Sequence, residues 1–474
     1  MNLLEMTGKK NQHNILFAYT GKPLELKDEE LHKLPYVPVG GLNLYSTKEL
    51  KKLLNGVKQD FFVLYTKAEL PVLGEHALER LMQVAEDSGA GMVYSNYQEI
   101  VGGVRKNHPV NDYQIGSVRD DFDFGPLLLI RTSAAKEALE VKDLAYEHAG
   151  LYDLRLKISA KYGILHLEEN LYTIEETDLR DSDEKMFAYV DPKNRAVQVE
   201  MEQACTAHLK AIGAWLPPVF ETVDLSKGTF PVEASVIIPV RNRIKTISDA
   251  IHSVLEQVAA FKFNLIVVDN HSTDGTSEAI AKFAAKDKRI IHVMPEREDL
   301  GIGGCWNVGV QHPQCGRFAI QLDSDDVYSG PDTVSKIVAA FYEQNCAMLV
   351  GTYRMCNVKL ETIPPGIIDH REWTEENGRN NALRINGLGA PRAFFTPALR
   401  IIKVPNTSYG EDYALGLQFS RRWRIGRIYD VLYLCRRWED NSDAAIDLVR
   451  LNANNVYKDK LRSIEIKARQ RQNK

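Results

Sequence analysis

The chain lacks long apolar runs and paired cysteine motifs, and each absence excludes a class of protein. No apolar run reaches the roughly 18 residues that a membrane-spanning helix needs, and the first residues carry no apolar core of signal-peptide length. The six cysteines are scattered and include no Cys-x-x-Cys pair, which favours reduced thiols over a zinc site or a disulfide framework. The net charge of −5 gives no support to nucleic-acid binding. We therefore expect a cytoplasmic globular protein.

Length and composition indicate several domains. The chain has 474 residues, 44% apolar and 26% charged, which is ordinary for a globular protein but too much for a single core. Residues 216–232 hold three prolines and a glycine and are typical of a linker. The sequence thus predicts a first module at 1–215, a second module at 233–445 and a basic C-terminal helix at 446–474.

In the second module, apolar strand patterns alternate with helical patterns. Strands are expected at 235–240, 264–268 and 318–322. Helices are expected at 246–258, between the first two of these strands, and at 277–286, after the second. This alternation predicts a parallel sheet, which binds ligands at the carboxyl ends of its strands. Three polar residues fall at those ends, namely Asn242, Asp269 and Asp323.

The first module repeats part of the second. Residues 60–69 align with 316–325, and residues 92–97 align with 348–353 at the same offset and without a gap. We interpret the two modules as copies of one fold; the alternative is two unrelated α/β domains whose buried strands look alike. Lys67 stands where the second module has Asp323, so we expect a catalytically silent first module. Shaping an acceptor site, self-association and bracing the second module are open roles for it.

Three carboxylates, Asp323, Asp325 and Asp326, follow the strand at 318–322 within four residues. Carboxylate oxygens suit Mg²⁺ or Mn²⁺, and such an ion offsets the charge of a departing diphosphate. Asp325 and Asp326 are the candidate metal ligands. The alternative is a solvated acidic turn.

Another acidic pair, Glu411-Asp412, opens a helical pattern far downstream. An acceptor hydroxyl must lose a proton when it attacks, and a carboxylate is able to take it. Asp412 is the candidate base, and Glu411 is the second choice or an acceptor-binding group. The alternative is a pair of charges that stabilises the start of a helix.

Several residues suit a nucleotide sugar. The carboxylate of Asp269 is able to accept a hydrogen bond from a ring N–H of uracil or guanine. Two arginines near the end of the module suit a diphosphate because a guanidinium donates hydrogen bonds in pairs. The candidate donor-binding residues are Pro239, Arg241, Asn242, Asp269, Asn307, Asp323, Arg436 and Arg437. The alternative for Asp269 is a role in helix capping alone. The alternative for Arg241 is an ordinary surface arginine, and that for Asn307 is a place in a flexible glycine-rich loop.

The loop at 387–395 feeds a strand and is expected to line the acceptor side, with Gly389 and Arg392 as its candidate residues. Arg392 carries the single charge of this loop.

Taken together, these motifs between about 234 and 445 resemble the inverting glycosyltransferases of family 2. The resemblance implies an α/β fold of GT-A type, a Rossmann-like mixed sheet of nucleotide-diphospho-sugar transferases flanked by helices, preceded here by a truncated GT-A-like module. It also implies a nucleoside-diphosphate sugar donor, a glycan or lipid-linked acceptor, and Mn²⁺ or Mg²⁺. By position, Asp269 would bind the nucleotide base, Asp323 and Asp325 would contact the ribose and the metal, and Asp326 would share the metal. Asp412 would be the general base that accepts the proton of the acceptor hydroxyl.

The chain departs from this family at two positions. Trp306 stands where many relatives have an arginine, and Trp438 stands where many have a histidine that is able to bind the metal. Glu439, water or donor oxygens are the alternatives for that third metal contact. A sugar-phosphate nucleotidyltransferase and a non-catalytic nucleotide- or glycan-binding scaffold remain the rival functions.

The last 25 residues, 450–474, hold eight Lys/Arg against two acidic residues. A basic amphipathic helix is able to lie on the inner face of an anionic membrane, which would suit a lipid-linked acceptor. The alternative is a helix packed on its own domain.

Overall fold

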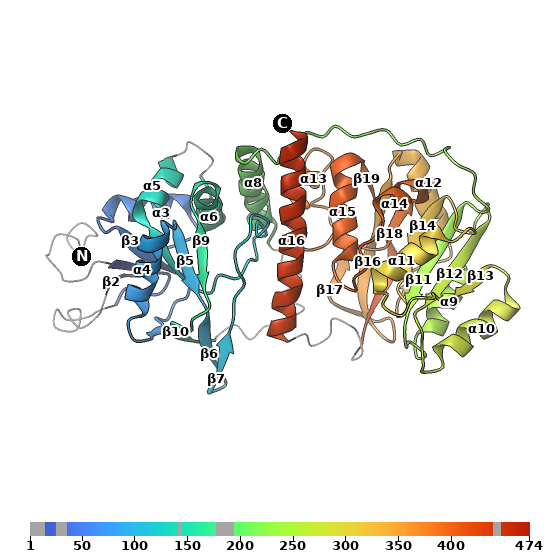
Figure 1. Ribbon diagram of the computed structural model, residues 1–474, viewed down its shortest axis with the longest axis horizontal. Coiled ribbons are helices and arrows are strands. Elements are labelled where there is room, and N and C mark those ends of the chain that lie inside the picture. The colour runs from blue at the N-terminus through green and yellow to red at the C-terminus, as the bar shows by residue number, and fades with distance from the viewer. Residues whose placement is uncertain (1–14, 25–35, 141–144, 177–193, 439–446) are drawn as a thin grey trace. The chain divides into compact units, whose positions relative to one another are not determined.

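The computed structural model describes residues 15–24, 36–140, 145–176, 194–438 and 447–474. The described residues form two compact units (Figure 1). The first unit contains the described residues up to 215 together with 447–474, and the second contains 216–438. The C-terminal helix therefore belongs to the first unit by its contacts, although the whole second unit separates the two in the sequence.

The first unit is built on a six-stranded sheet of order β2-β1-β3-β8-β5-β9. Only β8 runs antiparallel to its neighbours. The strands are β1 (Ile15–Tyr19), β2 (Val37–Val39), β3 (Phe61–Tyr65), β5 (Met92–Ser95), β8 (Leu127–Arg131) and β9 (Ile164–Leu167). A second, four-stranded sheet has the order β4 (Val72–Leu73), β10 (Tyr172–Glu175), β6 (Tyr97–Val101) and β7 (Val104–His108). The helices are α3 (Thr47–Gly56), α4 (Ala77–Ser88), α5 (Thr132–Glu140), α6 (Gly150–Lys161), α8 (Arg195–Ala211) and α16 (Leu448–Gln472).

The second unit has one nine-stranded mixed sheet of order β13-β12-β11-β14-β18-β16-β19-β15, with β17 paired to β16. The strands are β11 (Ala234–Val240), β12 (Phe263–Asp269), β13 (Ile290–Val293), β14 (Phe318–Gln321), β15 (Val327–Tyr328), β16 (Met348–Asn357), β17 (Thr362–Ile368), β18 (Arg392–Phe395) and β19 (Ile425–Arg437). The helices are α9 (Ile247–Leu255), α10 (Thr276–Lys286), α11 (Ile302–Gln311), α12 (Thr333–Gln344), α13 (Gly378–Asn381), α14 (Thr396–Ile402) and α15 (Glu411–Arg422). The predicted mixed α/β sheet is confirmed here.

The two sheets follow the same path. In the second unit, β12-β11-β14-β18-β16-β19 repeats the order of the first sheet, and only β18 runs antiparallel to its neighbours. Strand β3 holds the place of β14, and β5 holds the place of β16. These are the pairs of segments that align in the sequence.

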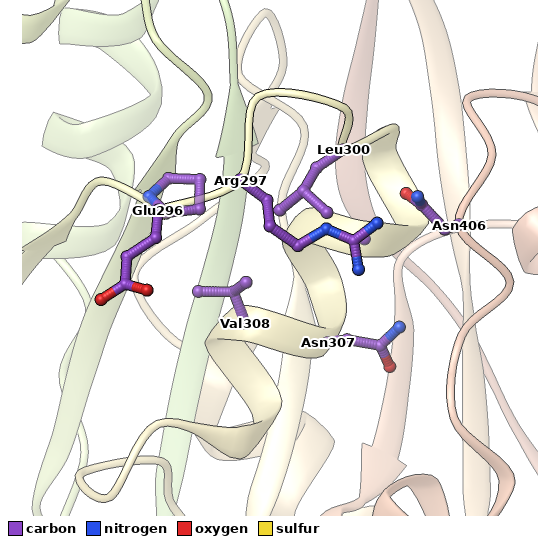
Figure 2. A pocket seen from close by; sticks show the side chains of 8 residues that line it. Glu296, Arg297, Leu300, Asn307, Val308 and Asn406 are labelled. Atoms are coloured by element: carbon purple, nitrogen blue, oxygen red, sulfur yellow. The ribbon is translucent and has the colours of Figure 1, made fainter.

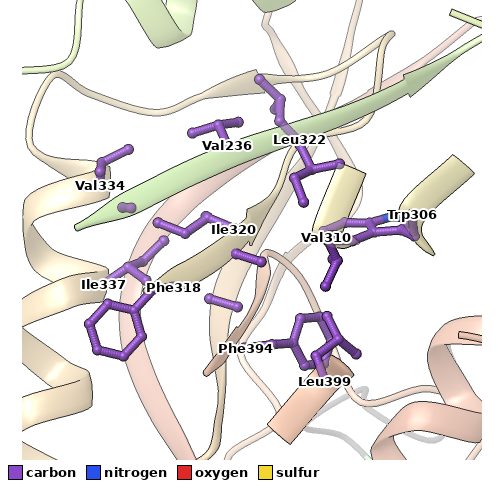
Figure 3. Packing of buried hydrophobic residues seen from close by; sticks show 14 of the residues in the cluster. Val236, Trp306, Val310, Phe318, Ile320, Leu322, Val334, Ile337, Phe394 and Leu399 are labelled. Atoms are coloured by element: carbon purple, nitrogen blue, oxygen red, sulfur yellow. The ribbon is translucent and has the colours of Figure 1, made fainter. Parts of the chain in front are cut away.

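The core of the second unit explains why its central strands are apolar along their length. Helices cover both faces of this part of the sheet, so both sets of alternating side chains are buried. Figure 3 shows Val334 and Ile337 of α12 near Phe318, and Trp306 and Val310 of α11 nearer to Phe394. Trp306 is a core residue with its ring 6.1 Å from that of Phe394.

The stretch expected as a linker packs on the second unit. The Arg379 side chain donates hydrogen bonds to the carbonyls of Pro217 and Val219, and Arg317 donates to the carbonyl of Leu225. Within the described ranges, no helix is long and apolar enough to cross a membrane.

Candidate active site

Asp323 follows β14 and is held by the last residue of that strand. The side-chain amide of Gln321 donates to both carboxylate oxygens of Asp323 at 3.0 Å. The backbone N–H of Asp323 donates to the hydroxyl of Tyr433, on β19, at 3.1 Å. Asp323 therefore has a fixed position at the carboxyl end of the sheet, as its place in the sequence predicted.

Asp325 is partly buried beside Arg243 and Trp438, neither of which was predicted to bind the donor or the metal. The guanidinium of Arg243 lies 3.7 Å from its carboxylate, and Trp438 also interacts with it. Burial and the neighbouring Asp323 raise the pKa of Asp325. The arginine that reaches the carboxylates is thus Arg243, whereas Arg241 is exposed. The signal was present in the Pro-Val-Arg-Asn-Arg turn, but sequence alone does not tell its two arginines apart.

Asp326 is buried and faces β19. Its carboxylate accepts a hydrogen bond from the backbone N–H of Arg436 at 2.7 Å, and the Tyr433 hydroxyl also bonds to it. Burial and the charges of Asp325 and Asp323 raise its pKa well above the usual range. These contacts give Asp326 a part in holding β19, and its predicted role as a metal ligand stays a prediction.

A chain of hydrogen bonds joins Asp323 to the predicted base. The side-chain carbonyl of Gln321 accepts from the backbone N–H of Arg392 at 3.0 Å. The Arg392 guanidinium lies 2.9 Å from the carboxylate of Asp412 and donates to the carbonyl of Gly389 at 2.8 Å. The structure therefore brings the predicted acceptor-side residues and the predicted base together. Burial works against the charge of Arg392, but Asp412, Asp323 and Glu411 outweigh it and raise its pKa.

Gly389 has a backbone conformation that suits glycine. Its φ is +102°, and an added Cβ would lie 2.9 Å from Cδ2 of His370 and 3.0 Å from Cγ1 of Val350. His370 is itself fixed by the carboxylate of Glu372 at 2.7 Å. The Gly389 carbonyl accepts a hydrogen bond from Arg392, and the turn that holds it there thus requires a residue without a side chain at position 389.

Glu411 and Asp412 form the first turn of α15. Burial, followed by the charge of Asp412, raises the pKa of Glu411 to about 8. Its Oε2 atom is buried and has no hydrogen-bond partner among the described residues. Burial thus favours the protonated form of Glu411, which is able to donate a hydrogen bond, and the role of Asp412 as the base stays a prediction.

Asp269 ends β12 and is fully buried. Its carboxylate accepts from the backbone N–H of Ser272 at 3.1 Å and from the Ser277 hydroxyl, and the His292 ring lies 3.2 Å away. Burial would raise the pKa of Asp269, but the hydrogen bonds from His292, Ser277 and Ser272 together lower it. Asp269 is thus ionised and accepts hydrogen bonds. A ring N–H of a nucleotide base would bond to this carboxylate either beside these donors or in place of one of them.

The turns after β11 and β12 are joined by Asn242. Its side-chain carbonyl accepts from the backbone N–H of Thr273 at 2.8 Å, and its own N–H donates to the Ser272 hydroxyl at 3.0 Å. Its φ of +54° lies in the left-handed region, which asparagine tolerates. Pro239 is on β11, three residues earlier.

Asn307 and Arg436 are engaged with the protein itself. The Asn307 amide donates to the carbonyl of Val404 at 2.7 Å and accepts from its N–H at 2.9 Å. The Arg436 guanidinium lies 2.7 Å from Asp249 and also binds the carbonyl of Asp325. Arg437 is the last residue of β19 and is paired in register with Asn357. These contacts support structural roles, and donor binding by these residues stays a prediction.

A pocket of about 390 Å³ lies beside α11 (Figure 2). Its lining residues are Pro295, Glu296, Arg297, Leu300, Gly304, Asn307, Val308 and Asn406. Asn307 is the one member of this lining that belongs to the predicted site. The carboxylates of Asp323, Asp325 and Asp412 do not line it, so the pocket is separate from the proposed chemistry.

A divalent ion would suit the chemistry of the carboxylate cluster. The charge of Asp323 raises the pKa of Asp325, the charges of both raise the pKa of Asp326, and a cation would offset this repulsion. Across the described ranges, however, no three His, Cys, Asp or Glu side chains converge as a complete metal cage. Glu439, one alternative for the third metal contact, lies outside the described residues.

Residues 235–405 match the family model described as glycosyl transferase family 2. A Bacillus subtilis (strain 168) protein named as a teichuronic acid biosynthesis glycosyltransferase, TuaG, is 35% identical over 26% of this chain and 46% of its own length. An uncharacterized glycosyltransferase of Rickettsia bellii (strain RML369-C) is 41% identical over 48% of this chain and 33% of its own. The chain spans less than half the length of these curated relatives.

Two solved structures are similar to part of the chain. S. aureus TarS 1-349 in complex with UDP-GlcNAc is 24% identical with a TM-score of 0.38, covering 48% of this chain and 70% of that one. The mannosyltransferase PcManGT from Pyrobaculum calidifontis, in complex with GDP-Man and Mn²⁺, is 15% identical with a TM-score of 0.35, covering 59% and 85%. Residues 235–405 are therefore similar to glycosyl transferase family 2, and they lie on the mixed sheet of the second unit.

Proposed function

We propose that the second unit transfers one sugar from a UDP- or GDP-sugar to a hydroxyl of a glycan or lipid-linked acceptor, with inversion at the anomeric carbon. The family match and the named role of TuaG support this assignment, and they favour a surface polysaccharide as the product. The observation that carries the proposal is the chain of contacts from Asp323 through Gln321 and Arg392 to Asp412.

The proposed reaction is a single displacement. The acceptor oxygen bonds to the anomeric carbon while the bond from that carbon to the diphosphate breaks, and the nucleoside diphosphate leaves with the electron pair. Asp412 accepts the proton of the acceptor hydroxyl. Arg392 positions Asp412, because its guanidinium is fixed by both the carboxylate and the carbonyl of Gly389. Glu411, protonated at neutral pH, is suited to donate a hydrogen bond to a sugar oxygen.

Mn²⁺ or Mg²⁺, when bound, would offset the charge that develops on the leaving diphosphate. Asp325, together with Asp323, is the residue pair best suited to hold it. Asp326 is less suited because its carboxylate already accepts the backbone N–H of Arg436.

We also propose that the first unit is a GT-A-like module without catalytic activity. The strand order of its sheet matches that of the second unit and supports a common fold. The residues at the position of the carboxylates of the second unit support the absence of catalytic activity. Lys67, in the position of Asp323, is paired with Glu176 at 3.0 Å. Gly21, beyond β1, packs so closely that an added Cβ would lie 1.8 Å from the carbonyl oxygen of Ala68. The turns after β1 and β3 thus touch where a donor would otherwise enter.

Isothermal calorimetry of UDP and GDP, each with Mn²⁺ and with EDTA, tests the donor site. Metal-dependent binding of one nucleotide is expected, with at least a tenfold loss in Asp325→Ala. Asp332→Ala is the matched control, because that carboxylate is 57% exposed at the start of α12 in the same unit. Absence of binding by either nucleotide would overturn the proposal. Binding without release of nucleoside diphosphate from any donor would favour the scaffold alternative.

A further inference from the structure

Helix α16 has one exposed face with a regular composition. The exposed residues Val449, Ala453, Val456, Lys460, Ile464, Lys467 and Arg471 recur every three or four positions along it. Side chains at this spacing share one face of a helix. The apolar members are well exposed, with Val449 at 71% and Ile464 at 58%.

The acidic residues of α16 lie on its other side. Asp459 and Glu465 are buried, at 1% and 3% exposure. Asp459 pairs with Arg462 at 2.8 Å, and Glu465 pairs with Arg469 at 2.7 Å. Two cations are thus neutralised inside the first unit, and the exposed face presents apolar and cationic side chains without a carboxylate.

We propose that this face of α16 binds the surface of an anionic lipid bilayer. Lysine and arginine near such a surface are attracted to its anionic headgroups. Their long aliphatic side chains let the charged end stay at the headgroups while the methylene groups contact the apolar region below. Val449, Val456 and Ile464 would enter the boundary between headgroups and acyl chains, as in interfacial helices. The site lies in the first unit and does not depend on the proposed transfer reaction, although it would suit a lipid-linked acceptor.

The same face fits a second copy of the chain less well. Spacings of three and four residues also occur at coiled-coil seams, but those seams are apolar. Lys460 and Lys467 would meet their own copies in a parallel pair. The apolar members of this face would have no part in binding nucleic acid.

Co-sedimentation of the full chain with vesicles tests the proposal. Binding is expected to vesicles of equal parts phosphatidylglycerol and phosphatidylcholine, and not to phosphatidylcholine alone. Each cation near the surface contributes roughly fivefold to partitioning, so Lys460→Gln/Lys467→Gln/Arg471→Gln should weaken it roughly a hundredfold. Ile464→Ser should weaken it without any change of charge. The matched control is Lys48→Gln/Lys51→Gln/Lys52→Gln, three exposed lysines on α3 of the same unit.

Equal losses in both triple variants would overturn the proposal, because binding would then follow net charge alone. Absence of vesicle binding would also overturn it, as would a dimer in sedimentation velocity that Ile464→Ser abolishes, or binding to RNA in place of vesicles. All these measurements omit nucleotide, so their failure leaves the donor-binding experiment unaffected.

Discussion

The guanidinium of Arg392 lies 2.9 Å from the carboxylate of Asp412, and the backbone N–H of the same arginine binds Gln321. Arg392 is the first residue of β18, Asp412 lies in the first turn of α15, and Gln321 ends β14. Gln321 also holds Asp323. One buried amide therefore links the proposed donor side to the proposed base.

We expect Gln321→Leu to lower both nucleotide affinity and turnover, each roughly tenfold, because Asp323 loses the amide nitrogen that donates to both of its carboxylate oxygens and the backbone N–H of Arg392 loses its acceptor. Gln257→Leu is the control: its amide donates to the carbonyl of Gly330 at 2.7 Å and accepts from Val334, away from the carboxylates. It should cost stability but leave affinity unchanged. Calorimetry and donor turnover measure the two effects, and similar losses of affinity in both variants would contradict the link.

Asp412→Asn should lower the release of nucleoside diphosphate from the donor by roughly 10²–10⁴-fold, the usual contribution of a general base. Glu411→Gln should retain most activity below pH 7, because glutamine resembles the protonated form of Glu411. Steady-state turnover of each variant with saturating donor compares the two. The opposite ranking would make Glu411 the base.

The stability of the second unit should depend on the proton of Glu411. Burial raises the pKa of Glu411 to about 8 in the folded chain, whereas an unfolded glutamate titrates near about 4.3. The stabilisation by this proton is complete below the unfolded pKa and is lost as the pH rises through the folded pKa. Between about pH 5 and 8, Glu411→Gln should remove a slope of roughly 1.4 kcal/mol per pH unit from the free energy of unfolding. Urea unfolding measures it, and identical slopes in both proteins would refute the shift.

Gly389→Ala should be more disruptive than a glycine substitution elsewhere with positive φ. Gly103, with φ of +80° and no atom within 4 Å of an added Cβ, isolates the backbone cost, which is about 1–2 kcal/mol. At Gly389 the new methyl also meets His370 and Val350. We expect a larger loss of stability and a lower turnover there, measured by thermal unfolding and donor turnover. Equal losses at the two sites would show that the turn adapts.

Asp459→Asn should destabilise the first unit by about 3–5 kcal/mol, because it leaves the buried guanidiniums of Arg119 and Arg462 without their shared carboxylate. Asp121→Asn removes the other partner of Arg119 and is the control. That carboxylate is 55% exposed, so the loss should stay within about 1 kcal/mol. Chemical unfolding followed by circular dichroism tests the difference, and comparable losses would mean that α16 contributes little to this unit.

Much of the fold followed from local patterns. Apolar runs such as those of β11 and β12, separated by helical periodicity, predict a parallel sheet wherever they occur. Because the carboxyl ends of parallel strands share one edge, Asp269 and Asp323 could be placed there without coordinates. The alignment of β3 with β14 likewise predicted that the two sheets would resemble each other.

The roles of individual side chains were harder to predict. Arg241 and Arg243 stand in the same turn, but only packing shows that Arg243 faces Asp325. Asn307 occurs in a motif that suggested a ligand, yet its amide is satisfied by Val404. A sequence states which groups are available and not which of them the protein itself uses.

The amino-acid sequence alone predicts the order of strands and helices, the edge of the sheet where the carboxylates gather, and the excess of cations in the last helix. These features depend on periodicity and on residue type, which are local. The tertiary structure decided that Gln321 joins Asp323 to Arg392 and Asp412, that Glu411 is buried enough to keep its proton, and that α16 turns its carboxylates inward. Such outcomes depend on contacts between segments that are distant in the chain, and on the burial that follows from them.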